Sequence, residues 1–278
     1  MKKLSWIGTF VVLAIVAIAL MQVVGWRKPV ENVYAKHLTV MTYNTHRMGE
    51  FQKPDKNRVL QYLQRQNADV ICLQEVEVYK EKKYLTLQEL RESLKLYPYT
   101  YFDFSVYNKR RQFGNAVFSR YPLVNKQTIR YRSRSNISSQ CDIVVDGDTL
   151  RLITNHLESN RLEHIDSTLI DKLDTARSIR REQAKALRQA RKHSPYPLLI
   201  VGDFNDIPLS YTYLVTRGWM RDCFLETCPG QIGVTYERHH LGVRIDYILC
   251  SRDLHPTACR VERVRHSDHY PVVATIGW

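Results

Sequence analysis

The stretch His266-Ser267-Asp268-His269-Tyr270-Pro271-Val272 stands immediately before the last apolar run of the chain. It places an acid beside a histidine where that run, which is rich in β-branched residues, predicts the start of a strand. Neighbouring side chains alternate between faces along a strand, but where a strand begins both can line one cleft. One would then serve as an oxygen ligand and the other as a base. Alone, an Asp-His pair is more typical of a protein surface, so its meaning depends on the other strand ends.

Polar side chains of the same kinds recur at the ends of other predicted strands. Turn-forming Asn and Asp are common at such positions, but that does not explain a whole set of ligands and proton carriers. Because a sandwich or mixed sheet brings strand ends to one edge, the sequence predicts a shared site. Its members are Asn44 after the strand 37–43, Glu75 after 70–73, His156 after 150–154, Asp203 and Asn205 after 198–201, and Asp246 inside the strand 244–249.

The elements between these strand ends predict one α/β domain. Helical spacing of apolar residues predicts helices over 57–66, 85–96 and 174–192. No linker or repeat divides residues 36–278, which we take as the catalytic domain.

Oxygen donors among these residues predict a magnesium site. Glu75 and Asp268 offer carboxylates, and Asn44 adds a neutral oxygen. The six cysteines include no Cys-x-x-Cys pair, so thiolate coordination of zinc is not indicated. Mg²⁺, or Mn²⁺ in its place, prefers a few carboxylates together with water and phosphate oxygens. Such an ion would neutralise the charge that builds on a pentavalent phosphorane and on the leaving oxygen.

The remaining residues predict proton transfer and water positioning. His269 is the candidate general base, because an imidazole pKa near ~6.5 suits proton removal from water. Asp246 would fix its tautomer, as the aspartate of a catalytic triad does. Asp203 and Asn205 would orient the attacking water. His156 would donate a hydrogen bond to a phosphoryl oxygen as charge accumulates there.

Seven short motifs, taken in order, resemble those of the endonuclease/exonuclease/phosphatase superfamily. The resemblance runs from about residue 38 to 277 and implies a four-layered α/β sandwich of the deoxyribonuclease I type. It also implies metal-dependent hydrolysis of a phosphoester by one activated water. The motifs are Met41-Thr42-Tyr43-Asn44, Leu73-Gln74-Glu75, Gly114-Asn115-Ala116-Val117, Thr154-Asn155-His156-Leu157, Gly202-Asp203-Phe204-Asn205, Arg244-Ile245-Asp246-Tyr247 and Ser267-Asp268-His269-Tyr270-Pro271-Val272.

The resemblance assigns roles residue by residue but leaves one partner unidentified. It implies a metal site, a His–Asp pair, a second catalytic histidine, a water-positioning pair and a substrate contact. These are, in the same order, Asn44 and Glu75 with Asp268 nearby, His269 with Asp246, His156, Asp203 with Asn205, and Asn115. The carboxylate that partners His156 cannot be identified from the sequence.

The substrate stays open between classes. The net charge is +13, of which residues 1–35 contribute +3, and basic residues cluster at Lys109-Arg110-Arg111 and over 177–192. This surplus favours a polyanion or an anionic membrane surface. We expect a nuclease-like phosphodiesterase. The alternatives are a phospholipid or sphingomyelinase-like phosphodiesterase, or a phosphatase for phosphorylated small molecules. A catalytically inactive binding module is disfavoured, because every expected acid, amide and histidine is present.

The amino terminus predicts a membrane anchor. Residues 4–24 are twenty-one residues without a charge, flanked by Lys2-Lys3 and Arg27-Lys28. That length suffices to cross a bilayer and exceeds the ~7–15 apolar residues of a cleaved signal. We expect residues 1–28 to form a transmembrane helix with the catalytic domain on the extracytoplasmic side. Val33-Tyr34-Ala35 leaves open the alternative of a cleaved signal and secretion.

Overall fold

Fourteen strands and six helices carry element labels in the described part of the chain. The computed structural model describes residues 12, 15–17, 19–27, 33–49, 52–133, 135–160, 169–238 and 241–278. The strands are β1 (His37–Asn44), β2 (Val70–Tyr79), β3 (Tyr99–Tyr107), β4 (Arg111–Ser119), β5 (Leu123–Arg130), β6 (Ile137–Val145), β7 (Asp148–His156), β8 (Leu198–Asp203), β9 (Arg221–Asp222), β10 (Tyr236–Arg238), β11 (Leu241–Val243), β12 (Asp246–Cys250), β13 (His255–Val261) and β14 (Val272–Gly277). The helices are α2 (His46–Gly49), α3 (Arg58–Gln64), α4 (Leu87–Ser93), α5 (Leu169–Lys192), α6 (Tyr211–Arg217) and α7 (Cys223–Thr227).

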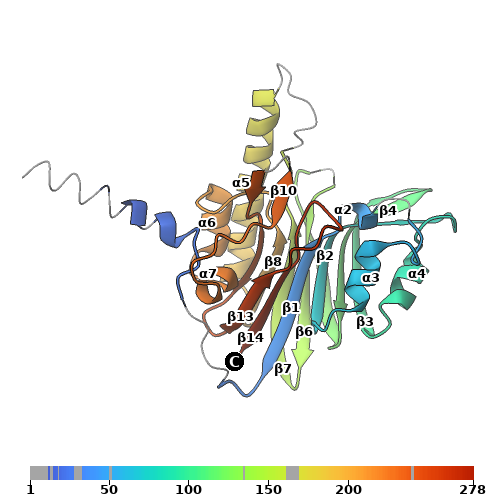
Figure 1. The fold of residues 1–278 in the computed structure, drawn as a ribbon, viewed down its shortest axis with the longest axis horizontal. Helices are drawn as coiled ribbons and strands as arrows, with labels where there is room; N and C mark the ends of the chain where they lie inside the picture. Colours follow the sequence, from blue (N-terminus) through green and yellow to red (C-terminus); the bar gives the residue numbers. More distant parts are fainter. Residues whose placement is uncertain are drawn as a thin grey trace, which may run out of the picture.

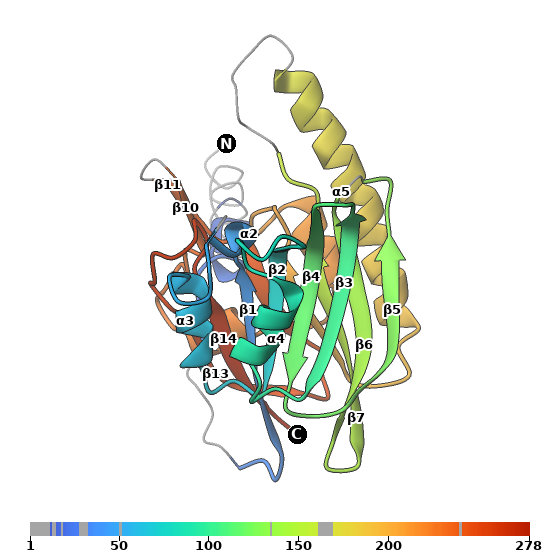
Figure 2. The ribbon, with the colours of Figure 1, turned by 90° about the vertical axis from the view of Figure 1, so that its right-hand side faces the viewer.

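Two six-stranded sheets pack face to face (Figures 1 and 2). The strand order is β13-β14-β1-β2-β4-β3 in the first sheet and β5-β6-β7-β8-β12-β9 in the second. Each sheet contains one parallel pair, β1 with β2 and β7 with β8, and its other pairs are antiparallel. A parallel pair places the carboxyl ends of both strands at the same edge, which is where the predicted site residues stand.

The alternation of side chains along each strand produces the layers. In β1, Leu38 and Val40 point between the two sheets, while Met41 and Tyr43 point to the outer face under α3 and α4. In β8, Leu199 and Val201 face the inter-sheet core, and Ile200 faces a third apolar cluster under α5 and α6. Helices therefore cover the outer face of each sheet (Figure 2), and the predicted α/β sandwich with two sheets is confirmed.

The predicted elements are confirmed, but several boundaries were wrong, including the start of α5, which begins at Leu169. The helices expected over 57–66, 85–96 and 174–192 are α3, α4 and α5. β2 does not end at Glu75, because the strand continues to Tyr79 through an irregularity in its pairing with β4. Asp246 opens β12 and does not lie inside a strand. The difference in β2 arises because Gln74 and Glu75 interrupt the regular pairing of β2 with β4.

The amino-terminal anchor stays a prediction. Most of the apolar run 4–24 lies outside the described residues. Within the part of the chain that the structure does describe, no helix is both long and apolar enough to cross a bilayer. Residues 15–17 and 19–21 are helical, and the side chains of Ile15 and Leu20 are exposed.

Gly202 joins the second sheet to the predicted site and should not tolerate a side chain. Its φ is +120°, and a Cβ there would lie 2.2 Å from the carbonyl oxygen of Asn155 in β7. We expect Gly202→Ala to lower the free energy of unfolding by about 2–4 kcal/mol, because it adds a backbone clash to the strain of a positive φ. Urea unfolding of the full chain measures this.

Gly147→Ala is the matched control. Gly147 also has a positive φ, +88°, but its Cβ would meet nothing within 4 Å. It should therefore cost only about 1 kcal/mol, from strain alone. Equal losses in the two variants would show that the contact between Gly202 and β7 is not tight.

Candidate active site

Strand pairing places the predicted residues at one edge of the sandwich. His156 ends β7 beside Asp203, which ends the parallel strand β8. The antiparallel strand β12 begins at this same edge, and its first residue, Asp246, lies directly opposite Asp203. Asn44 ends β1 in the facing sheet. The pairing register of the strands therefore brings together residues that are far apart in the sequence.

Glu75 reaches the edge through a distortion of β2. The pairing of β2 with β4 shifts between Leu73 and Val76, so Gln74 and Glu75 form a bulge. Glu75 has a φ of +54°, which is rare for a residue with a side chain. A bulge re-aims side chains and is common beside functional sites. Here it brings the Glu75 carboxylate to the other site residues and leaves it 25% exposed.

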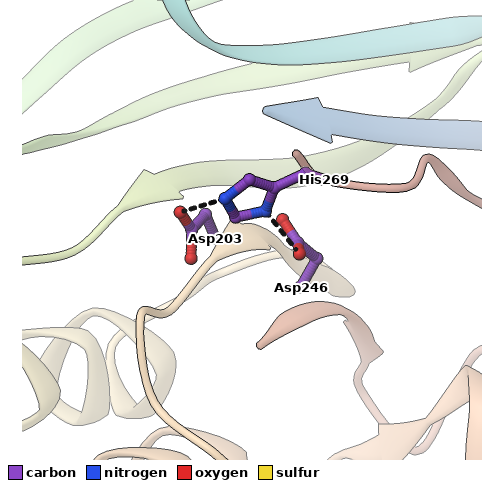
Figure 3. A group of neighbouring side chains, drawn as sticks. All are labelled: Asp203, Asp246 and His269. Carbon is purple, nitrogen blue, oxygen red and sulfur yellow. Dashed lines mark hydrogen bonds and ion pairs between the residues drawn. The ribbon is translucent and has the colours of Figure 1, made fainter. Parts of the chain in front are cut away.

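His269 lies between two aspartates at the centre of the site (Figure 3). Its Nδ1 lies 2.9 Å from Asp246 Oδ2, and its Nε2 lies 3.8 Å from Asp203 Oδ2. All three side chains are buried. A proton on Nδ1 would be donated to Asp246, which leaves Nε2 as the acceptor that faces Asp203.

This setting changes two pKa values. Burial by itself would lower the pKa of His269, but the charges of Asp246 and Asp203 outweigh it and raise the pKa to about 10. Burial raises the pKa of Asp203 to about 6, although the His269 charge opposes the rise. The two carboxylates favour the protonated, cationic form of His269. Of the three groups, His269 is therefore the one whose protonation this arrangement changes most strongly.

Asn44 and Asn205 hold the Asp203 carboxylate in place. Asn44 Nδ2 donates to Asp203 Oδ2 at 2.9 Å and to Glu75 Oε1 at 3.2 Å, so it links the two sheets. Asn205, at a φ of +49°, donates its backbone N–H to Asp203 Oδ1 at 2.7 Å. Its Nδ2 donates to Asp203 Oδ2 and to the carbonyl oxygen of Leu157. These donors fix the orientation of Asp203.

His156 and Asn115 are placed differently from one another. The sequence left the carboxylate partner of His156 unidentified. In the structure, His156 Nε2 lies 3.4 Å from Glu75 Oε1. Asn115 in β4 is buried opposite the β2 bulge and donates from Nδ2 to Ser139 Oγ in β6. Its Oδ1 has no hydrogen-bond partner among the described residues. Among the described residues, the Asn115 side chain donates only to atoms of β6 and β7 in the second sheet.

Asp268 pairs with a histidine that sequence reasoning missed. Its Oδ1 lies 2.9 Å from His46 Nδ1, and its side chain is 33% exposed. Burial would raise the pKa of Asp268, but the His46 hydrogen bond and the His269 charge outweigh it and lower that pKa. His46, Arg47 and Met48 all have positive φ in the left-handed turn α2. The signal available in the sequence was a histidine two residues after the strand-ending Asn44.

Three further residues that the sequence did not single out support His269. Ser267 Oγ donates to the carbonyl oxygen of Asn44 at 2.9 Å and accepts from the backbone N–H of His269 at 3.2 Å. Thr235 Oγ1 accepts from the backbone N–H of Asp246 at 3.0 Å. The Tyr236 ring lies 4.9 Å from the His269 ring. Small hydroxyl residues carry no sequence signal for such positioning roles.

A comparison with protein families decides the identity of this domain. The model of the endonuclease/exonuclease/phosphatase family matches residues 41–269. The chain belongs to this family. It is therefore a hydrolytic phosphoesterase by family, as the motifs predicted, and the matched region spans all the predicted site residues. Among curated proteins, none matches the sequence significantly.

Solved structures of the family share the fold. An endonuclease/exonuclease/phosphatase from Beutenbergia cavernae DSM 12333 is 20% identical with a TM-score of 0.64, over 87% of this chain and 72% of that one. Truncated TDP2 from Caenorhabditis elegans is 17% identical with a TM-score of 0.64, over 89% and 100%. Sphingomyelinase C from Streptomyces griseocarneus is 17% identical with a TM-score of 0.62, over 87% and 99%. At these identities the likeness establishes the fold alone.

The Asp246 carboxylate should control the titration of His269. We expect Asp246→Asn to lower the pKa of His269 by about 1–3 in the metal-free protein, because it removes the charge that favours the imidazolium. NMR titration of the imidazole signals measures this. Asp268→Asn is the control and should lower it less, since Asp268 is the weakest of the named causes. Equal effects of the two variants would contradict the pairing.

The same shift predicts how stability depends on pH. The pKa of His269 is raised in the folded state, so its contribution is complete below ~6.5 and is lost as pH rises towards about 10. Between these values the wild type should lose more unfolding free energy than Asp246→Asn. Parallel stability curves from urea unfolding would show that His269 is not paired in solution.

Proposed function

We propose that the chain hydrolyses a phosphodiester by means of a water that His269 activates. The observation that carries the proposal is the distance of 3.8 Å between His269 Nε2 and Asp203 Oδ2. Asp246 holds His269 through Nδ1, and Asn44 holds the Asp203 carboxylate. A water beside this pair could hydrogen-bond to both atoms. Asp203 would orient it, and His269 would take its proton at Nε2 while Asp246 stabilises the imidazolium.

The residues present suit a divalent cation, and we propose Mg²⁺, with Mn²⁺ able to replace it. Glu75, Asp268 and Asn44 are hard oxygen donors, and both carboxylates are partly exposed, as a hydrated ion requires. Asp246 Oδ1 is buried without a partner in the described part of the chain, which is where a water or ion is expected. When bound, the cation would neutralise charge on the phosphorane and leaving oxygen. Its positive charge would also disfavour the imidazolium form of His269, so that Nε2 could accept a proton from water.

Asp203, Asp246 and His269 also lie close enough together to hold an ion. We assign them to proton transfer because both oxygens of Asp203, Asp246 Oδ2 and His269 Nδ1 already have partners, and only Asp246 Oδ1 has none among the described residues. Asp203 accepts three N–H groups from Asn44 and Asn205, and His269 Nδ1 is engaged by Asp246. Glu75 accepts fewer hydrogen bonds than Asp203 and is therefore the better ligand.

His156 is proposed to act on the phosphoryl group. Its Nε2 lies near Glu75, so a phosphate held by an ion at Glu75 would lie within its reach as a hydrogen-bond acceptor. Asn115 keeps its predicted role as a substrate contact. Its buried Oδ1 has no hydrogen-bond partner among the described residues, which leaves one acceptor without a role in the fold.

Nucleic acid is the substrate class that the charge distribution favours. The β3–β4 turn with Lys109 and Arg110 lies at the same edge of the sandwich as α2 and the amino-terminal part of α5 (Figure 2). In α5, the buried Arg180 pairs with Asp206 and donates to the carbonyl oxygen of Glu158, which ties the helix to the end of β7. Arg177 and Arg181 on the same helix are exposed. Basic residues thus flank the active site on two sides, as a phosphate backbone would require.

A phospholipid is the second candidate. The amino-terminal segment has exposed apolar side chains, including Ile15 and Leu20, which favour a membrane. We propose that residues 1–28 anchor the chain with its catalytic domain on the extracytoplasmic side, with secretion after cleavage as the alternative. The active site would then meet lipid headgroups, as well as soluble phosphoesters.

Loss of the general base should abolish turnover under either substrate assignment. We expect His269→Ala to lower the hydrolysis rate by about 10²–10⁴-fold, since general base catalysis contributes this much. The full chain is assayed in a neutral detergent with Mg²⁺ on supercoiled plasmid and, separately, on phospholipid. A chelated sample should be equally inactive. Full activity of His269→Ala or of the chelated sample would refute the mechanism. Hydrolysis of phospholipid while the plasmid stays intact would select the second substrate.

The flanking charges should govern binding to nucleic acid. We expect Lys109→Ala/Arg110→Ala to weaken DNA binding and to reduce the dependence of log K on log salt by about two, since each phosphate contact contributes ~0.9. Arg65→Ala/Lys95→Ala is the control, because these exposed residues lie shortly before the starts of β2 and β3, at the opposite edge. Equal slopes for the two variants would mean that the turn does not contact the backbone. Fluorescence anisotropy measures the slopes.

A further inference from the structure

A basic pocket of about 330 Å³ lies beside α6 and α7. This volume is within the range of small-ligand sites. Four arginines line it, together with one acid and one tryptophan. They are Arg27, Arg217, Arg221, Arg252, Glu226 and Trp219.

The charges of this pocket are not balanced. Glu226 is shared between two guanidinium groups, with Arg221 at 3.0 Å and Arg27 at 3.4 Å. Arg217 and Arg252 donate to the backbone carbonyl oxygens of Met220 and Trp219, which carry no charge. The lining therefore has a surplus of three positive charges. Arg221 Nε is also buried without a hydrogen-bond partner among the described residues.

An anion with several acceptor oxygens would satisfy this arrangement. Guanidinium groups bind phosphate through paired N–H donors and tolerate partial burial better than ammonium groups. A phosphate group combines charge and acceptors in a size that the pocket accommodates. The ligand chemistry is therefore that of a phosphate ester.

The pocket is separate from the active site. β12 begins with Asp246 in the active site and ends at Cys250, which pairs with Arg221. Four residue steps along a strand span ~13 Å, and Arg252 follows two residues later. A phosphate in this pocket is therefore not the one that His269 would attack.

The chain that follows the apolar amino-terminal run is fixed to the pocket. The backbone N–H of Trp26 donates to the carbonyl oxygen of Leu225 in α7, and the Gly25 N–H donates to that of Gln231. A Cβ on Gly25 would lie 1.9 Å from the carbonyl oxygen of Cys228, so only glycine allows this approach. Arg27 thus reaches the pocket three residues after the apolar run ends at Val24. Figure 1 shows this segment beside α6 and α7.

Exposed aromatic side chains distinguish a lipid headgroup from a free phosphate. Trp219 lines the pocket with 76% of its surface exposed, and Trp26 is 46% exposed. Tryptophan beside arginine is typical of the headgroup level of a membrane, where the ring meets apolar chains and the cation meets phosphate. A soluble phosphate would gain nothing from these rings.

We propose that the pocket of Arg27, Arg217, Arg221 and Arg252 binds the phosphate of an anionic phospholipid headgroup and holds the domain against an anionic membrane surface. The proposal does not depend on the reaction at His269. It adds to the amino-terminal segment a headgroup contact made by the folded domain itself.

Thermal unfolding of the full chain in micelles of a neutral detergent tests the proposal. EDTA prevents turnover, and phosphatidylglycerol or phosphatidylcholine is added to the micelles. We expect phosphatidylglycerol to raise Tm by about 3–6 °C, because a ligand that binds only the folded state stabilises it. Phosphatidylcholine should raise Tm less, since its choline neutralises the phosphate.

The pocket variant is Arg27→Gln/Arg252→Gln, and Arg65→Gln/Lys95→Gln is the control with the same change in net charge. Each lipid shift is measured against the same variant without lipid, so a variant that is merely less stable still reports binding. The pocket variant should lose most of its phosphatidylglycerol shift and the control should keep it. Equal shifts in the two variants would overturn the proposal.

A soluble arm separates the two sources of phosphate. Inorganic phosphate and glycerol phosphate, at the same total concentration as the lipid, should give little shift. A shift as large as that of phosphatidylglycerol, lost in the pocket variant, would replace the lipid proposal with a free phosphate site. Trp219→Ala should reduce the lipid shift, and an unchanged lipid shift would contradict the membrane assignment.

Discussion

Burial of ionisable groups around His269 is the constraint on which the rest of the structure depends. Removing Asp203 and Asp246 from water is costly unless each is paired or hydrogen-bonded. The protein meets this cost by placing His269 between them and by directing N–H groups from Asn44 and Asn205 at Asp203. Asn44 comes from β1 in the first sheet, His269 from the loop before β14, and Asn205 from the turn after β8 in the second sheet. The site therefore holds together only when the sandwich is complete, so fold and active site are specified together.

Much of the fold and most of the site were predictable because their signals are local. Apolar runs that end in Asn44, His156 and Asp203 identify strands and their polar ends without tertiary information. Pairing then explains why the ends meet, since parallel strands share an edge and Asp246 faces Asp203 by register. The family resemblance supplied the order of the motifs. The partner of His269 was correctly predicted as Asp246.

What sequence reasoning missed depends on backbone geometry that residue type does not encode. Glu75 was expected at a strand end, but it occupies a bulge within β2, and a bulge depends on how β4 pairs with that strand. His46 reaches Asp268 because α2 is a left-handed turn, although none of its first three residues is glycine. Thr235 and Ser267 position the His269–Asp246 pair through short hydroxyl contacts. Such contacts form only in the assembled fold and produce no periodic pattern in the sequence.

β12 connects the active-site edge with the arginine pocket and fixes their positions relative to one another. Its first residue, Asp246, belongs to the buried cluster around His269, and its last, Cys250, lies beside the arginine pocket. A strand in the interior of a sheet is among the most rigid elements of a domain, so a contact made at one end sets the position of the other. If a headgroup occupies the pocket, the bilayer plane is defined relative to the active-site edge by the second sheet itself. The substrate that can reach His269 then depends on that fixed orientation as much as on the chemistry of the catalytic residues.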